Sequence, residues 1–127
     1  MNPLEMFKSF EQGCFYTLTS TKALMDVAWK EHPTFCGVFL KEVLSLEAGG
    51  GKFSLHLVRL NPGAAIGLHV HPKSIELHEV IAGSGSCLLN GKELAYMPGN
   101  MALIPCGVEH QVQAGEQGLC LFAKFIY

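Results

Sequence analysis

Five residues able to bind a metal ion or transfer a proton lie within eleven positions of this 127-residue chain: His69, His71, Glu76, His78 and Glu79. His69 and His71 are two positions apart, so they share a face on a strand but diverge on a helix. Glycines and prolines on both sides of the pair favour the strand. Two imidazoles on one strand face, about 7 Å apart, can converge on one ion. The alternative is that both are ordinary surface or core histidines.

A second strand is predicted at residues 75–81, after a turn at residues 72–74. It would place Glu76, His78 and Val80 on one face. The two strands would then offer imidazoles and a carboxylate to a shared space. Such ligands suit a divalent transition metal ion, namely Zn, Fe(II), Mn, Ni or Co.

Length and composition indicate one globular domain, residues 1–127, with enough apolar residues for a core. The net charge of −2 and the pI near 6.3 give no electrostatic reason to bind nucleic acid or an anionic membrane. The start of the chain lacks the basic and apolar regions of a signal peptide, and no apolar run is long enough to span a bilayer. We therefore expect a cytoplasmic protein.

The cysteines support this compartment. Their number is odd and they form no C-x-x-C pair, which indicates reduced thiols rather than a disulfide framework or a zinc knuckle. Cys87 and Cys120 lie in apolar segments and are expected to pack as small hydrophobic residues.

Short apolar segments separated by glycine, proline and asparagine turns run through the chain. The segments are 38–46, 53–60, 75–81, 86–89, 92–96, 101–104, 108–113 and 119–127. Gly83-Ser84-Gly85 and residues 114–118 are expected to be turns, and Asn90-Gly91 predicts a hairpin with a type I′ turn. The pattern predicts an all-β sandwich or barrel.

The first 35 residues are open to two interpretations. Ser20 could cap a short helix, or residues 25–29 could form an edge strand. We favour the strand, because no long helix is predicted elsewhere. Aromatic side chains in the same region could cover an edge of the core: Phe7, Phe10, Phe15 and Tyr16.

With these residues in place, the chain resembles a small single-domain bacterial cupin of the cupin 2 conserved-barrel type. The first cupin motif, G-x5-H-x-H-x4-E-x6-G, is matched by Gly63, His69, His71, Glu76 and Gly83. The second motif, G-x5-P-x-G-x2-H-x3-N, is matched by Gly99, Pro105, Gly107 and His110. Its last position holds Ala114 in place of asparagine, so nine of the ten positions agree.

The resemblance implies a cupin-type double-stranded β-helix, or jelly-roll barrel, with the two motifs at residues 63–114 and a flanking segment at residues 1–35. It also implies that one divalent ion is held inside the barrel by His69, His71, Glu76 and His110. Members of the family often dimerise, so we expect a homodimer. The departure at Ala114 affects a turn position and no ligand.

His78 shares the predicted inward face with Glu76 and is our candidate catalytic residue. It could be a fifth ligand, a hydrogen-bond partner of a ligand, or a proton shuttle. The alternative is a barrel histidine paired with a carboxylate. Glu79 should point outward, whereas His56 could line the cavity. Tyr96, Arg59 and Lys124 are further candidate substrate contacts.

An ion with three histidine ligands and one glutamate ligand keeps coordination positions open, where it can acidify water or take up oxygen and substrate. We expect a metal-dependent enzyme of the dioxygenase, isomerase or lyase type that acts on a small polar organic molecule. The alternative is a non-catalytic metabolite-binding or sensor protein. Few cations lie nearby, namely Lys52, Arg59 and Lys124, which disfavours a strongly anionic substrate.

Overall fold

The computed structural model describes residues 3–127, and most of these belong to one eight-stranded antiparallel sheet. The strands are β3 (Lys30–Glu31), β4 (Val38–Leu44), β5 (Phe53–Leu60), β6 (Ala65–His69), β7 (Ile75–Leu89), β8 (Lys92–Tyr96), β9 (Met101–Ile104) and β10 (His110–Ile126). They pair in the order β3-β4-β5-β10-β7-β8, with β6 beside β10 and β9 beside β7. The predicted all-β class is confirmed.

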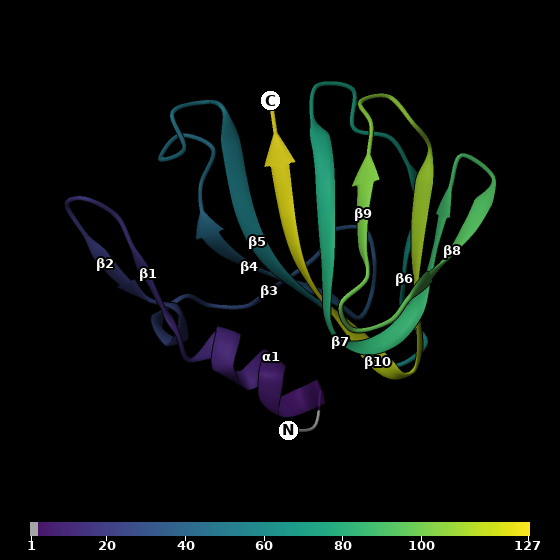
Figure 1. Ribbon diagram of the computed structural model, residues 1–127, viewed down its shortest axis with the longest axis horizontal. Coiled ribbons are helices and arrows are strands. Elements are labelled where there is room, and N and C mark those ends of the chain that lie inside the picture. Colours follow the sequence, from purple (N-terminus) through teal and green to yellow (C-terminus); the bar gives the residue numbers. More distant parts are fainter. Residues whose placement is uncertain (1–2) are drawn as a thin grey trace.

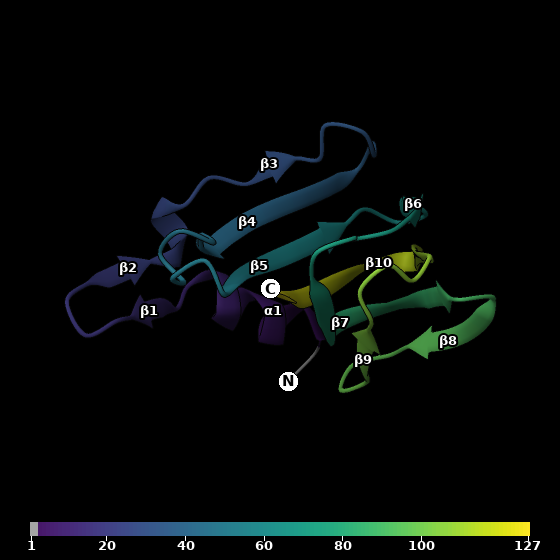
Figure 2. The same ribbon diagram turned by 90° about the horizontal axis from the view of Figure 1, so that it is seen from above.

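The two long strands β7 and β10 belong to both halves of a barrel. Residues 119–126 of β10 pair with β5, whereas residues 110–113 pair with β6. Figure 1 shows the strands arranged around a common interior. Seen from above in Figure 2, strands β3, β4 and β5 lie on one side, and β7 and β8 lie on the other. This arrangement is the jelly-roll barrel that the resemblance to cupins implies.

Two segments predicted as turns lie inside these long strands, so that prediction was wrong. β7 continues through Gly83-Ser84-Gly85, and β10 continues through residues 114–118, where its register against β7 shifts. Gly83 and Gly118 have φ values of 81° and 78°. Irregularities of this kind bend a strand without ending it. They allow β7 and β10 to pass from one half of the barrel to the other.

The other strand predictions agree well with the structure. β5, β8 and β9 have the predicted bounds, and β4 ends two residues early, at Leu44. Asn90 and Gly91 have φ values of 48° and 81°, as a type I′ turn requires. The predicted hairpin between β7 and β8 is confirmed.

Successive side chains along a strand point to opposite faces of the sheet, and apolar side chains form a cluster on each face. The inner cluster fills the barrel and includes Val58, Val80 and Leu121. The outer cluster lies on the opposite face of the sheet, beneath α1 (Pro3–Glu11) and a 3-10 helix (Leu24–Asp26). Phe7 of α1 is buried there against Trp29, with ring centroids 6.0 Å apart. The N-terminal segment therefore covers the outside of the barrel.

The N-terminal predictions were partly wrong. Residues 25–29 form no strand, because the 3-10 helix occupies their first two positions and the other three pair with no strand. α1 was not expected. Phe7, Phe10 and Phe15 reach the outer cluster as predicted, whereas Tyr16 is 73% exposed. Tyr16 lies on the small hairpin of β1 (Cys14–Tyr16) and β2 (Thr21–Ala23), which projects from the barrel in Figure 1.

Cys87 and Cys120 are buried, as predicted, and no cysteine is in a disulfide. Burial raises the pKa of the Cys120 thiol to about 12.

The helices found within residues 3–127 are too short to cross a lipid bilayer.

Candidate metal centre

Four of the predicted site residues converge inside the barrel. Each of His69, His71, Glu76 and His110 offers one ligand atom, and these atoms all lie within 4.8 Å of one another. Glu76 and His110 are buried, whereas His69 and His71 are partly exposed. The cluster is therefore deep on one side and accessible on the other.

Strand pairing brings these distant residues together. His69 ends β6, and His110 begins β10, directly opposite His69 in the register of the two strands. Glu76 is the second residue of β7 and points into the barrel. His71 lies beyond the end of β6, so the prediction that both histidines belong to one strand was wrong.

The segment that carries His71 is held by the loop before β10. The N–H of Gly107 donates to the His71 carbonyl at 2.9 Å, and the Cys106 thiol donates to the Pro72 carbonyl at 2.7 Å. The proline-cysteine-glycine break between β9 and β10 thus fixes the backbone at His71. These contacts compensate for the absence of strand pairing at that position.

The hydrogen bonds of the rings determine which nitrogens face the cluster. Nδ1 of His69 lies 2.6 Å from the Gly67 carbonyl, and Nδ1 of His110 lies 3.0 Å from the Val108 carbonyl. A carbonyl only accepts, so both Nδ1 atoms carry the proton and, in the neutral rings, both Nε2 atoms present a lone pair. This is the arrangement that metal-binding histidines generally have.

Lone pairs and negative charge therefore meet at the centre of the cluster. Nε2 of His69 lies 3.2 Å from Nε2 of His71, and Nε2 of His110 lies 3.1 Å from Oε1 of Glu76. Two nitrogen lone pairs, or a lone pair and a carboxylate oxygen, repel each other at these distances unless a proton or a cation lies between them. Three imidazoles and one carboxylate fit a borderline divalent metal ion. The chemistry of the donor set is thus compatible with the ion expected for this site.

The electrostatics agree with that donor set. Burial acts to raise the pKa of Glu76, but hydrogen bonds from His110, His71 and His78 outweigh it and hold this pKa well below its usual range. Burial lowers the pKa of His69. Burial opposes protonation of His110 as well, but the Glu76 carboxylate and the Val108 carbonyl raise the pKa of His110 overall. Glu76 and His110 thus each favour the charged form of the other.

His78 lies on the other side of Glu76. It is 2% exposed, and its Nε2 is 3.0 Å from Oε2 of Glu76. Its Nδ1 is 2.7 Å from the hydroxyl of Tyr96. Both ring nitrogens therefore have partners.

A cavity of about 140 Å³ adjoins the cluster. Its walls are formed by His32, Leu40, His56, Val58, Ile66, His69, His71, Glu76, His78, Leu121, Ala123 and Phe125. Apart from the cluster, His32, His56 and His78 are its polar side chains. His56 was an expected lining residue. His32 was missed, because it enters from the loop before β4 and no motif spacing points to it.

No lysine or arginine belongs to the lining of this cavity, so two predicted substrate contacts were wrong. Arg59 lies on the outer face, over the rings of Trp29 and Phe39 at 4.7 and 4.9 Å. Lys124 pairs with Glu79, also on the outer face, where Glu79 was expected. Tyr96 is buried and reaches His78 rather than the cavity.

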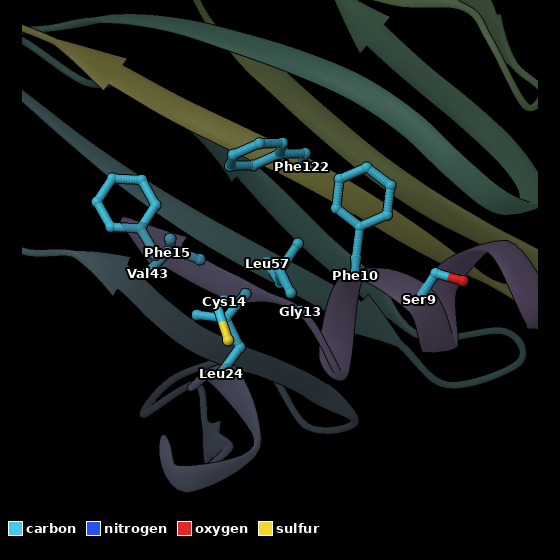
Figure 3. A pocket seen from close by; sticks show the side chains of 9 residues that line it. All are labelled: Ser9, Phe10, Gly13, Cys14, Phe15, Leu24, Val43, Leu57 and Phe122. Carbon is cyan, nitrogen blue, oxygen red and sulfur yellow. The ribbon is translucent and has the colours of Figure 1, made fainter. Parts of the chain in front are cut away.

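A larger pocket of about 360 Å³ lies outside the barrel, between the N-terminal segment and the sheet (Figure 3). Figure 3 shows apolar side chains around it, among them Phe10, Phe15 and Phe122. Its lining contains neither a histidine nor a carboxylate. Unlike the inner cavity, this pocket therefore offers no ligand set for a metal ion.

The profile of the cupin domain family matches residues 56–122, more than half of the chain. The chain belongs to the cupin family. All four converging residues lie within the matched cupin region.

Two characterised proteins are similar to part of this chain. An oxalate-binding protein of Thermotoga maritima is 30% identical over 77 residues, which are 60% of this chain and 64% of that protein. A mannose-1-phosphate guanylyltransferase of Klebsiella pneumoniae is 27% identical over 62 residues, 49% of this chain but 13% of that enzyme. The matches thus span less than two thirds of these curated relatives.

Among solved structures, this cupin is similar to a predicted oxalate decarboxylase from Thermotoga maritima. The TM-score is 0.74 at 25% identity, and the match covers 80% of this chain and 94% of that one.

Proposed function

We propose that this cupin holds one divalent transition metal ion with His69, His71, Glu76 and His110, and binds a small organic molecule in the adjoining cavity. The observation that carries the proposal is the convergence of four ligand atoms within 4.8 Å. Nitrogen-rich ligand sets of this kind favour Fe, Mn, Zn, Ni or Co over Mg or Ca. When bound, such an ion would polarise a ligand oxygen or acidify a water molecule.

The cavity restricts the size of the ligand. Its volume of about 140 Å³ is close to that of an engineered cavity of about 150 Å³ that binds benzene. We therefore propose a ligand with roughly six non-hydrogen atoms. Leu40, Val58, Leu121 and Phe125 would contact its apolar part.

The charges of the site restrict the ligand further. A divalent ion and the Glu76 carboxylate leave a net charge of about +1, and no lysine or arginine adds to it at the cavity wall. This charge suits a monoanion or a neutral chelator better than a dianion. His32 accepts the N–H groups of Thr34 and Phe35 at Nδ1, so in the neutral ring its Nε2–H remains available to an oxygen of the ligand.

A dicarboxylate such as oxalate is the second candidate ligand. The names of the oxalate-binding protein and the predicted oxalate decarboxylase favour it. The apolar, cation-free walls disfavour it, because a dianion would bring uncompensated charge into the cavity. The choice between these two ligand classes is therefore open to direct measurement.

The proposed activity is that of a metal-dependent enzyme of the dioxygenase, isomerase or lyase type. A protein that binds its ligand without turnover is the alternative. The experiment is to load the full chain with each metal, measure the metal per chain, and titrate oxalate and monocarboxylates of similar size by calorimetry. Oxygen uptake and product analysis then separate an enzyme from a binding protein.

We expect one ion per chain and tighter binding of the monocarboxylate. Tighter binding of oxalate would favour the second candidate, and a chain that retains none of these ions would contradict the metal proposal. The homodimer and the single domain with a flanking segment at residues 1–35 remain predictions. Light scattering and limited proteolysis test them.

A further inference from the structure

The Glu76 carboxylate is held from two sides. Oε1 faces the imidazoles of the cluster, 3.1 Å from Nε2 of His110, whereas Oε2 lies 3.0 Å from Nε2 of His78. Nδ1 of His78 lies 2.7 Å from the Tyr96 hydroxyl. Three side chains thus form a buried row, with His78 2% and Tyr96 1% exposed.

The direction of each hydrogen bond in this row follows from the groups at its two ends, a carboxylate and a phenol. An ionised carboxylate only accepts, so Nε2 of His78 carries a proton and donates to Glu76. In the neutral ring, Nδ1 then has a lone pair and the Tyr96 O–H donates to it. Burial raises the pKa of Tyr96, which keeps the phenol protonated.

We propose that Tyr96 and His78 are positioning residues for Glu76: Tyr96 orients the His78 ring, and His78 holds Oε2 so that Oε1 alone is presented to the three imidazoles. This inference rests on the proposed metal site and deepens it. The row crosses from β8 to β7, because Tyr96 ends β8 and pairs with Gly85. Both residues reach the cluster only through Glu76.

The geometry opposes the other roles considered for His78. A fifth ligand would need a nitrogen lone pair aimed at the cluster, but Nε2 faces Oε2 of Glu76. A proton shuttle would need one nitrogen free to meet the ligand, whereas both nitrogens have partners inside the protein. A positioning role uses both hydrogen bonds that the structure shows.

The test compares the metal affinities of four variants of the full chain by chelator competition. His78→Leu removes the donor to Oε2, and we expect a loss of about 10- to 100-fold, as is usual for partners of metal ligands. His78→Gln keeps an N–H donor and should restore most of that affinity. Tyr96→Phe should lose several-fold. The matched control, Tyr16→Phe, alters an exposed tyrosine and should change nothing.

Nitrogen NMR of the histidine rings in the metal-free chain provides a second, independent readout. We expect Nε2 of His78 to carry a proton, and the Nδ1 signal of His78 to shift in Tyr96→Phe but not in Tyr16→Phe. Equal losses in His78→Leu and His78→Gln, unchanged affinity in His78→Leu, or an Nδ1–H tautomer would overturn the inference. A wild-type chain that binds no ion would instead overturn the proposed function, and this role with it.

Discussion

The Nε2 atoms of His69 and His71 lie 3.2 Å apart. Because Nδ1 of His69 donates to the Gly67 carbonyl, the Nε2 atom of the neutral His69 ring brings a lone pair to this contact. Two imidazoles packed in this way need a shared proton or a cation between them. This contact, together with Glu76 and His110, leads to the following predictions.

Replacement of His110 by alanine should remove most of the bound metal and leave the β fold largely intact, because strand register depends on backbone pairs. We expect a cost of about 3 kcal/mol in the free energy of unfolding, since the fully buried His110 is a partner of the buried Glu76 charge. Elemental analysis and circular dichroism measure the two effects. The control is His56→Ala, which alters the same cavity outside the cluster. Full metal content in His110→Ala would refute the ligand assignment.

Transition metal ions should stabilise the folded chain and Mg²⁺ should not, because the cluster supplies mainly nitrogen donors. At a free metal concentration of about 100 times Kd, the gain is about 2.7 kcal/mol, or a rise of roughly 10 °C in Tm. Thermal melts with each ion, before and after chelator, provide the measurement. An equal rise in Glu76→Gln would show that the ions bind elsewhere.

The metal-free chain should lose stability in acid. The pKa of Glu76 is lower in the folded chain than its ordinary value of 4.5, so the unfolded chain takes up this proton first as the pH falls. The stability that Glu76 contributes is therefore present above about pH 4.5 and declines below it, by up to about 1.4 kcal/mol per pH unit. Denaturant titrations across this range should show a shallower decline in Glu76→Gln. Identical declines in the two proteins would contradict the prediction.

Alanine should be tolerated better at Gly99 than at Gly83, although both have positive φ. At Gly99 a Cβ meets no atom within 4 Å, so the cost is about 1–2 kcal/mol of backbone strain. At Gly83 the Cβ would overlap the Gly118 carbonyl, which forces the bends of β7 and β10 apart. We expect Gly83→Ala to cost at least about 3 kcal/mol. Similar melting temperatures for the two variants would argue against close contact at the bend.

Predictions from short sequence patterns were correct where interactions within a short segment decide the structure. The turn at Asn90-Gly91 depends on two positive φ values that few residues adopt, and the structure contains it. They failed at Gly83-Ser84-Gly85, because the same glycines end a strand when no partner continues and bend it when one does. They also missed α1, whose burial on the outer cluster depends on apolar partners distant in the sequence.

At the candidate site, too, short sequence patterns revealed some features, whereas others depended on residues distant in the sequence. The spacing of His69, His71 and Glu76, and their resemblance to the cupin motif with His110, indicated which residues to consider. The pairing of His78 with Glu76 was among the roles that the sequence suggested. The contact between His78 and Tyr96 carried no such signal, since Tyr96 comes from another strand.

The sequence by itself determined the β class, most strand positions and the residue types available to a metal ion, because alternation, turn chemistry and ligand chemistry are properties of short segments. Only the tertiary structure decided which nitrogen of each histidine faces the cluster, which oxygen of Glu76 is held away, and that Arg59 and Lys124 lie outside the barrel. These three features depend on which strands pair and on how far the strands bend. Each of those outcomes is set by contacts between residues that are remote along the chain.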